Sequence, residues 1–190
     1  MFNCGLVILA LLSTSNAGYV KLGEGLSLEW NFPDSQTIDF DLSVSDKLSD
    51  AVGWVSVGLK STKDAENKVN VDGVYVNEDD EEIEDVWTLE DGIARTDTSL
   101  KGKDSLDKSK ANVNGSGKEF SWSRNLNTDD SNDLDLFQGD EYYLYFGSGN
   151  ASEGLSEGSS NDIFGNYYGV ITLSKDFGTS STSAFLNFLN

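Results

Sequence analysis

Apolar residues recur at every second position along much of this chain, and this period most constrains its fold. Leu26, Leu28, Trp30 and Phe32 alternate with polar residues, and a similar alternation runs over residues 38–44. Such alternation is typical of strands with one buried and one hydrated face. Further strands are predicted over residues 52–59, 71–77, 83–90, 93–98, 118–124, 141–147 and 167–173.

The segments between these strands are rich in Gly, Ser, Asn and Asp, which favour turns. No window of the sequence has a convincing helical period. Many short strands at fairly even spacing predict an all-β sandwich or barrel. Residues 99–117 and 147–162 are polar or Gly/Ser-rich, and we interpret them as long surface loops, the first with room for a short hairpin.

The first 17 residues are interpreted as a secretory signal peptide. They contain a short apolar run over residues 6–12, followed by the small residues Ser15 and Ala17 at the positions that precede cleavage. A membrane span would need roughly 20 apolar residues, so none is expected here. The alternative is a buried N-terminal strand. We therefore expect a secreted or cell-surface protein, with a folded domain over residues 18–175 and a Ser/Thr-rich tail over residues 176–190.

The residue inventory restricts partners and chemistry. The formal net charge is −20, so nucleic acid and anionic lipid are not expected partners. The chain has no histidine, and cleavage after Ala17 would remove Met1 and Cys4, its only methionine and cysteine. Sequons at Asn114 and Asn150 predict N-glycosylation.

Four stretches of the chain resemble conserved strands of the DOMON domain, an extracellular module. They are GWVSVG at residues 53–58, VDGVYV at 71–76, IEDVW at 83–87, and residues 120–133, where Arg, Leu, Thr and Asp follow in order. The resemblance spans roughly residues 26–173. It implies an immunoglobulin-like antiparallel β-sandwich of about ten or eleven strands, with ligands between the sheets or at their open end. It also makes Asp72, in the second stretch, a candidate ligand-binding residue.

Members of this family bind haem or are thought to bind sugars. The haem-binding branch uses a methionine from the loop between the first two stretches and a later histidine as iron ligands. Here that loop reads KSTKDAENKVN over residues 60–70 and contains no methionine, and the sequence contains no histidine. Haem iron needs His, Met, Cys or Tyr, so only tyrosine would remain after cleavage, and we expect no cofactor.

The same inventory argues against catalysis. Copper and the usual zinc sites rely on imidazole or thiolate ligands, and the common nucleophile–base pairs use His or Cys. Residues 129–133 offer oxygens at alternating positions, but Leu134 and Asp140 occupy the places where an EF-hand loop needs Gly and Glu. We interpret this run as an acidic turn and expect no enzyme and no metal site, with weak calcium binding by acidic loops left open.

Two charged residues lie on strand faces that otherwise look buried. Asp85 shares a face with Ile83, and Arg124 shares a face with Trp122. A buried charge is costly unless it is paired, so we expect these two side chains to pair or to face one cavity. The alternative is that each lies at a strand end and reaches water.

Aromatic residues near these charges suggest a ligand. A cavity formed by Asp85 and Arg124 together with Tyr75, Trp87 and Trp122 would have the elements of a carbohydrate site. The alternative for each tryptophan is core packing. The favoured hypothesis is a non-catalytic module that binds carbohydrate or another neutral, hydroxyl-rich ligand. The alternatives are an acidic structural or adhesive protein with an extracellular protein partner, and a haem-binding electron-transfer domain.

Overall fold

The computed structural model describes residues 17–77, 82–108, 112–114, 117–150, 155 and 162–178. Within these ranges the chain forms twelve strands, one short α-helix and one 3-10 turn. These elements are β1 (Gly18–Gly23), β2 (Leu26–Asn31), β3 (Thr37–Ser45), α1 (Asp46–Ser49), β4 (Trp54–Ser61), β5 (Asp72–Asn77), β6 (Glu82–Thr88), β7 (Ala94–Thr96), η1 (Asp97–Leu100), β8 (Asp107–Lys108), β9 (Asn112–Asn114), β10 (Gly117–Asn125), β11 (Glu141–Gly149) and β12 (Asn166–Thr172).

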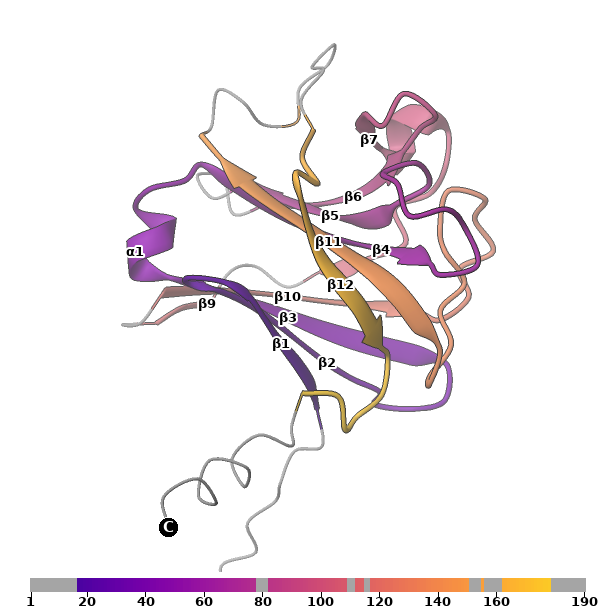
Figure 1. Cartoon of the computed structure of the whole chain (residues 1–190), viewed down its shortest axis with the longest axis horizontal. Coiled ribbons are helices and arrows are strands. Elements are labelled where there is room, and N and C mark those ends of the chain that lie inside the picture. Colours follow the sequence, from indigo (N-terminus) through magenta and orange to yellow (C-terminus); the bar gives the residue numbers. More distant parts are fainter. Residues whose placement is uncertain are drawn as a thin grey trace, which may run out of the picture.

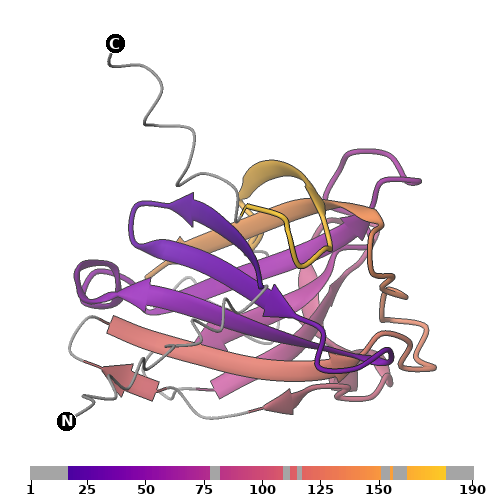
Figure 2. The ribbon, with the colours of Figure 1, turned by 90° about the horizontal axis from the view of Figure 1, so that it is seen from below.

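The strands form two antiparallel sheets that lie face to face (Figure 1). One sheet has the order β1-β2-β3-β10-β8, with β9 also paired to β10, and the other has the order β12-β11-β4-β5-β6-β7. Figure 2 shows the first sheet from its outer side. The predicted all-β sandwich is confirmed. The strands exceed the expected number because β1 was not predicted and because β8 and β9 lie in the segment interpreted as a loop.

The core lies between the two sheets and follows the predicted alternation. In β3 the buried positions are Ile38, Phe40, Leu42 and Val44, and every residue between them is partly exposed. β3 pairs with β10 along its whole length, from Thr37 opposite Asn125 to Ser45 opposite Gly117. This long register fixes which β10 side chains point into the core, because neighbours in a pair share a face.

Strand β4 departs from the alternation because it is buried on both faces. Its outer face is covered by Ile163 and Phe164 from the segment before β12, which join a second apolar cluster. A Cβ at Gly58 would lie 2.6 Å from Val71 Cγ1 and 2.8 Å from the Phe164 ring. Glycine at this position therefore allows the covering segment to approach the sheet closely.

The C-terminal part of the described chain packs on the domain. The Phe177 ring lies 5.8 Å from the Trp30 ring, and the Phe177 carbonyl accepts a hydrogen bond from the Tyr19 amide at 2.8 Å. The folded part thus continues at least two residues beyond the predicted boundary at 175, while the tail from residue 179 onward lies outside the described residues. The predicted signal peptide lies outside them too, except for Ala17.

The two predicted glycosylation sites fall at strand ends. Asn114 is the last residue of β9, and Asn150 is exposed directly after β11. Ser116 and Ser152, which complete the two sequons, lie outside the described residues, so glycosylation stays a prediction. Among the helices that the structure describes, none has the length and apolar character needed to cross a membrane.

Candidate functional site

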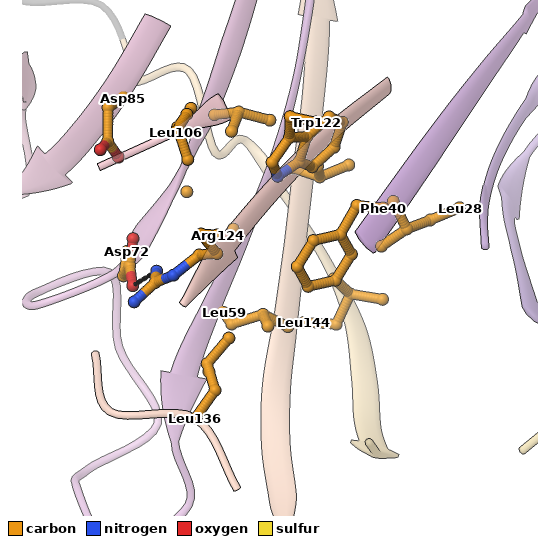
Figure 3. Close-up of a pocket in the computed structure, with 14 residues that line it drawn as sticks. Leu28, Phe40, Leu59, Asp72, Asp85, Leu106, Trp122, Arg124, Leu136 and Leu144 are labelled. Carbon is orange, nitrogen blue, oxygen red and sulfur yellow. Dashed lines mark hydrogen bonds and ion pairs between the residues drawn. The ribbon is translucent and has the colours of Figure 1, made fainter. Parts of the chain in front are cut away.

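Arg124 and Asp72 form a buried ion pair that joins the two sheets. Arg124 lies near the end of β10 and Asp72 begins β5, and their side chains are 5% and 4% exposed. Arg124 Nη1 donates a hydrogen bond to Asp72 Oδ2 over 2.5 Å (Figure 3). Arg124 Nη2 also donates to the Leu134 carbonyl at 2.8 Å, and the Leu134 amide donates to Asp72 Oδ2 at 2.8 Å. The pair therefore also fixes the connection between β10 and β11.

Burial and neighbouring charge act against each other at this pair. Burial raises the pKa of Asp72, and the attraction of Arg124 offsets only part of that effect. Burial lowers the pKa of the Arg124 guanidinium, but the Asp72 and Asp133 carboxylates outweigh this and raise it overall. Arg124 is consequently a permanent positive charge in the interior.

A small cavity lies beside the pair, between the sheets. It is lined by apolar side chains that include Leu28, Phe40 and Leu144, and by Trp122, Arg124, Asp72 and Asp85. Figure 3 shows the Asp72 and Asp85 side chains on the same side of this inter-sheet cavity, away from Phe40. Its volume is about 30 Å³, which is room for about one water molecule.

The expectation for Asp85 and Arg124 is confirmed in one of its two forms. They face a shared cavity, while the ion partner of Arg124 is Asp72 rather than Asp85. Asp85 Oδ2 accepts a hydrogen bond from the Ser105 amide at 2.9 Å. Burial, followed by repulsion from Asp72, raises the pKa of Asp85 to about 7.

The predicted aromatic residues do not all meet at this cavity. Trp122 lines it and stacks on Phe40, with ring centroids 5.3 Å apart. Tyr75 belongs to the second apolar cluster on the outer side of the other sheet, where its ring lies 5.9 Å from that of Trp54. Trp87 is partly exposed and does not line the cavity. A cavity of about 30 Å³ is also about ten times smaller than ordinary ligand pockets.

Two aspartates near the pair, the buried Asp97 and the partly exposed Asp133, were not predicted as site residues. Asp97, the first residue of η1, is 1% exposed, and Asp133 lies in the β10–β11 connection. Both carboxylate oxygens of each residue are buried and have no hydrogen-bond partner. Asp133 belongs to the run interpreted as an acidic turn, which was a signal for it, whereas nothing in the polar sequence around Asp97 indicated burial.

A larger pocket lies at the loop after β4. This loop-end pocket has a volume of about 310 Å³, and its lining residues are Ser61, Thr62, Lys63, Asp135, Phe137, Gly139, Asp140, Glu141 and Tyr142. Phe137 is 55% exposed, and its amide donates a hydrogen bond to the Tyr142 hydroxyl at 2.8 Å. Thr62 Oγ1 donates to the Glu141 carbonyl at 3.1 Å. The sequence signal for this pocket is an aromatic residue, Phe137, close to the acidic residues Asp135 and Asp140.

Hydrogen bonds from buried side chains hold the loop over residues 60–70 in place. Lys60 is 2% exposed, and its ammonium donates to Asn67 Oδ1 at 2.7 Å and to the Val69 carbonyl. The Tyr145 hydroxyl donates to the Asn67 carbonyl at 3.1 Å. These hydrogen bonds order the loop, and its residues 61–63 line the loop-end pocket.

The side chains of this chain do not fit haem. Neither His nor Met occurs among the described residues, so tyrosinate would have to bind the iron. Burial raises the pKa of Tyr145 to about 12 and also raises that of Tyr167, which disfavours tyrosinate at both positions. The inter-sheet cavity is also far smaller than a porphyrin.

Comparison with known proteins agrees with this architecture. A search of the curated proteins finds no match to this chain. The family model of the DOMON domain matches residues 22–149. That segment contains the buried pair Asp72–Arg124 and all the residues that line the inter-sheet cavity and the loop-end pocket. It covers well over half of the chain, and this chain therefore belongs to the DOMON family.

Proposed function

We propose that this protein is a non-catalytic DOMON module that binds carbohydrate in the loop-end pocket. The observation that carries the proposal is the exposed Phe137 ring in a pocket of about 310 Å³. Sugars are recognised by an aromatic face for their C–H groups and by polar groups for their hydroxyls. Lys63, Asp135, Asp140 and Glu141 supply such polar groups around the ring.

The geometry of the pocket supports binding without large rearrangement. The hydrogen bond between the Phe137 amide and the Tyr142 hydroxyl holds the aromatic residue in place. The bond from Thr62 to the Glu141 carbonyl ties the opposite wall to β11. A ligand that finds its site already ordered loses less conformational entropy on binding.

The absence of catalysis is part of the proposal. The buried carboxylates of Asp72 and Asp85 line a cavity of about 30 Å³, which is too small to admit a sugar ring. The carboxylates of the loop-end pocket are surface groups, and its Asp135, Asp140 and Glu141 have the character of hydrogen-bond acceptors for hydroxyls.

A glycan array tests this function, with the Phe137→Ala variant and a matched control. Tyr168→Ala is a suitable control because Tyr168 is 41% exposed on β12 and does not line the pocket. We expect the wild type and Tyr168→Ala to bind the same glycans, and Phe137→Ala to bind them at least about tenfold more weakly, which is about 1.4 kcal/mol. No binding by the wild type would reject carbohydrate binding in favour of an acidic structural or adhesive protein, and equal binding by Phe137→Ala would reject the loop-end pocket as the site.

We also propose that the protein is secreted and glycosylated. The apolar run over residues 6–12 and the sequons at Asn114 and Asn150 support this. Expression in a eukaryotic host should release into the culture medium a protein that begins at Gly18 and loses mass on treatment with an N-glycosidase. Retention of Met1 in a cell-associated, unglycosylated product would contradict it.

A further inference from the structure

Three aspartates from separate segments, Asp72, Asp85 and Asp133, come together in the domain, and the charges of all three act on a fourth, the buried Asp97. Asp72 begins β5, Asp85 lies in β6, Asp97 begins η1 and Asp133 lies in the β10–β11 connection. We refer to them as the four-aspartate cluster. Asp72, Asp85 and Asp133 each offer a carboxylate oxygen within 4.8 Å of the others. Asp97 is a buried neighbour whose carboxylate oxygens have no described partner and on which the charges of Asp85, Asp133 and Asp72 act, so it joins the cluster as a neighbouring charge and not as a ligand.

The hydrogen bonds in this region satisfy only part of the cluster. Asp72 accepts from Arg124 and from the Leu134 amide, and Asp85 Oδ2 accepts from the Ser105 amide. Asp85 Oδ1 and all four carboxylate oxygens of Asp97 and Asp133 are buried without a partner. Buried polar groups normally have partners, and a buried carboxylate without one is strongly unfavourable.

The balance of charges also indicates that the cluster lacks a counter-charge. The carboxylates of Asp72, Asp85 and Asp133 share one guanidinium, that of Arg124. Unless protons or cations neutralise it, the cluster carries an excess of negative charge inside the protein. The direction of the pKa shifts at Asp85 and Asp97, both upward, is what mutual repulsion and burial produce.

We propose that Asp72, Asp85 and Asp133 of the four-aspartate cluster bind one divalent cation of the calcium class. Two oxygens bound to one calcium ion at 2.3–2.6 Å lie at most about 5 Å apart, which accommodates the 4.8 Å limit among Asp72, Asp85 and Asp133. The donor set consists of oxygens alone, which suits calcium, magnesium or manganese rather than zinc or copper. The inter-sheet cavity beside Asp72 and Asp85 has room for a water ligand.

Arg124 has a separate role in this site. It holds Asp72 through Nη1 and the β10–β11 connection through Nη2, so it positions two of the ligand-bearing segments. Asp133 lies in that connection, one residue before Leu134. The cation site would thus link the sheet that contains β5 and β6 to the β10–β11 connection, and cation binding would stabilise the folded domain.

Calcium titration of the full chain, stripped with chelator and dialysed at pH 7.5, tests the proposal. By calorimetry we expect one calcium ion per chain, and by thermal unfolding a midpoint that rises by several degrees in millimolar calcium. Sodium chloride of equal ionic strength controls for screening of the −20 surface.

Variants separate this site from loose surface binding. Asp85→Asn and Asp133→Asn should weaken calcium binding at least about tenfold, whereas Asp50→Asn, an exposed position after α1, should bind as the wild type does. Asp97→Asn should raise the unfolding midpoint of the calcium-free protein, because it removes repulsion, and reduce the calcium-induced shift. No calcium-induced shift in the wild type, or equal shifts in Asp133→Asn and Asp50→Asn, would overturn the proposal.

Discussion

Arg124 of β10 reaches Asp72 of β5 across the interface between the sheets, over 2.5 Å and with both side chains almost fully buried. The pair is a buried polar contact in the largely apolar layer between the two sheets. The sequence indicated that Arg124 needed a buried partner, but it suggested Asp85 for that role. In the fold, Asp72 pairs with Arg124, and Asp85 belongs to the cluster beside it.

Loss of one member of this pair should destabilise the domain strongly. We expect Arg124→Met to lower the free energy of unfolding by about 3–5 kcal/mol, because it leaves the Asp72 carboxylate buried without a cation. The double variant Asp72→Leu/Arg124→Met should lose less than the sum of the single variants. Urea unfolding of all three measures this. Lys47→Met, which breaks an exposed pair with Glu24, is the control and should cost less than about 1 kcal/mol. Additive losses in the double variant would contradict a coupled pair.

Stability of the cation-free protein should fall as the pH rises. Burial, then repulsion from Asp85, Asp133, Asp72 and Asp130, raises the pKa of Asp97 from 3.8 to about 9. The folded state then binds a proton that the unfolded state has released, so νU − νN is negative above pH 4. This carboxyl group contributes its full stability below about pH 4, and that contribution is lost as the pH rises through about 9, at about 1.4 kcal/mol per unit.

Urea unfolding at pH 5, 7 and 9 in chelator measures this dependence. The Asp97→Asn variant should show a flatter decline than the wild type, since its amide does not titrate. Asp85 adds a smaller contribution over the range up to about pH 7. Equal slopes for wild type and variant would show that Asp97 is not the titrating group.

The loop over residues 60–70 should depend on its buried lysine. Lys60→Met keeps most of the aliphatic stem but removes the ammonium that bonds Asn67 and the Val69 carbonyl. We expect a loss of about 1–3 kcal/mol, because these acceptors lose their donor. Trypsin should also cleave faster after Lys63 or Lys68, which lie in the loop. Lys47→Met serves again as the exposed control. An unchanged cleavage rate would mean that the loop is held by other contacts, such as that of Tyr145.

Much of the fold could be predicted from local patterns, and parts could not. The alternation in β3 predicted its buried residues correctly, because side chains of a strand point to opposite faces by geometry alone. Strand β4 broke the rule, since Ile163 and Phe164 cover its outer face. Whether a second face is covered depends on a segment about a hundred residues later, which no local window contains.

The candidate sites show the same division. Two charges on apolar faces, Asp85 and Arg124, indicated a shared buried environment, and the structure confirms a shared cavity. Tyr75 and Trp87 were grouped with them by proximity along the strands, but the fold places Tyr75 on the outer cluster and leaves Trp87 partly exposed. Asp97 was missed because turn residues carry no periodic signal from which burial can be read. Phe137 stands out as an aromatic residue near acidic ones, but that local signal does not place it in a pocket.

The sequence by itself determined the strand faces, the acidic surface and the absence of imidazole ligands, since these follow from residue identity and a period of two. Only the tertiary structure decided that Asp72 rather than Asp85 pairs with Arg124 and that Asp97 and Asp133 join them. It likewise decided that the loop after β4 walls a pocket. The physical reason is that strand register and the stacking of two sheets bring together residues far apart in the chain, and local alternation encodes a face but not its opposite partner.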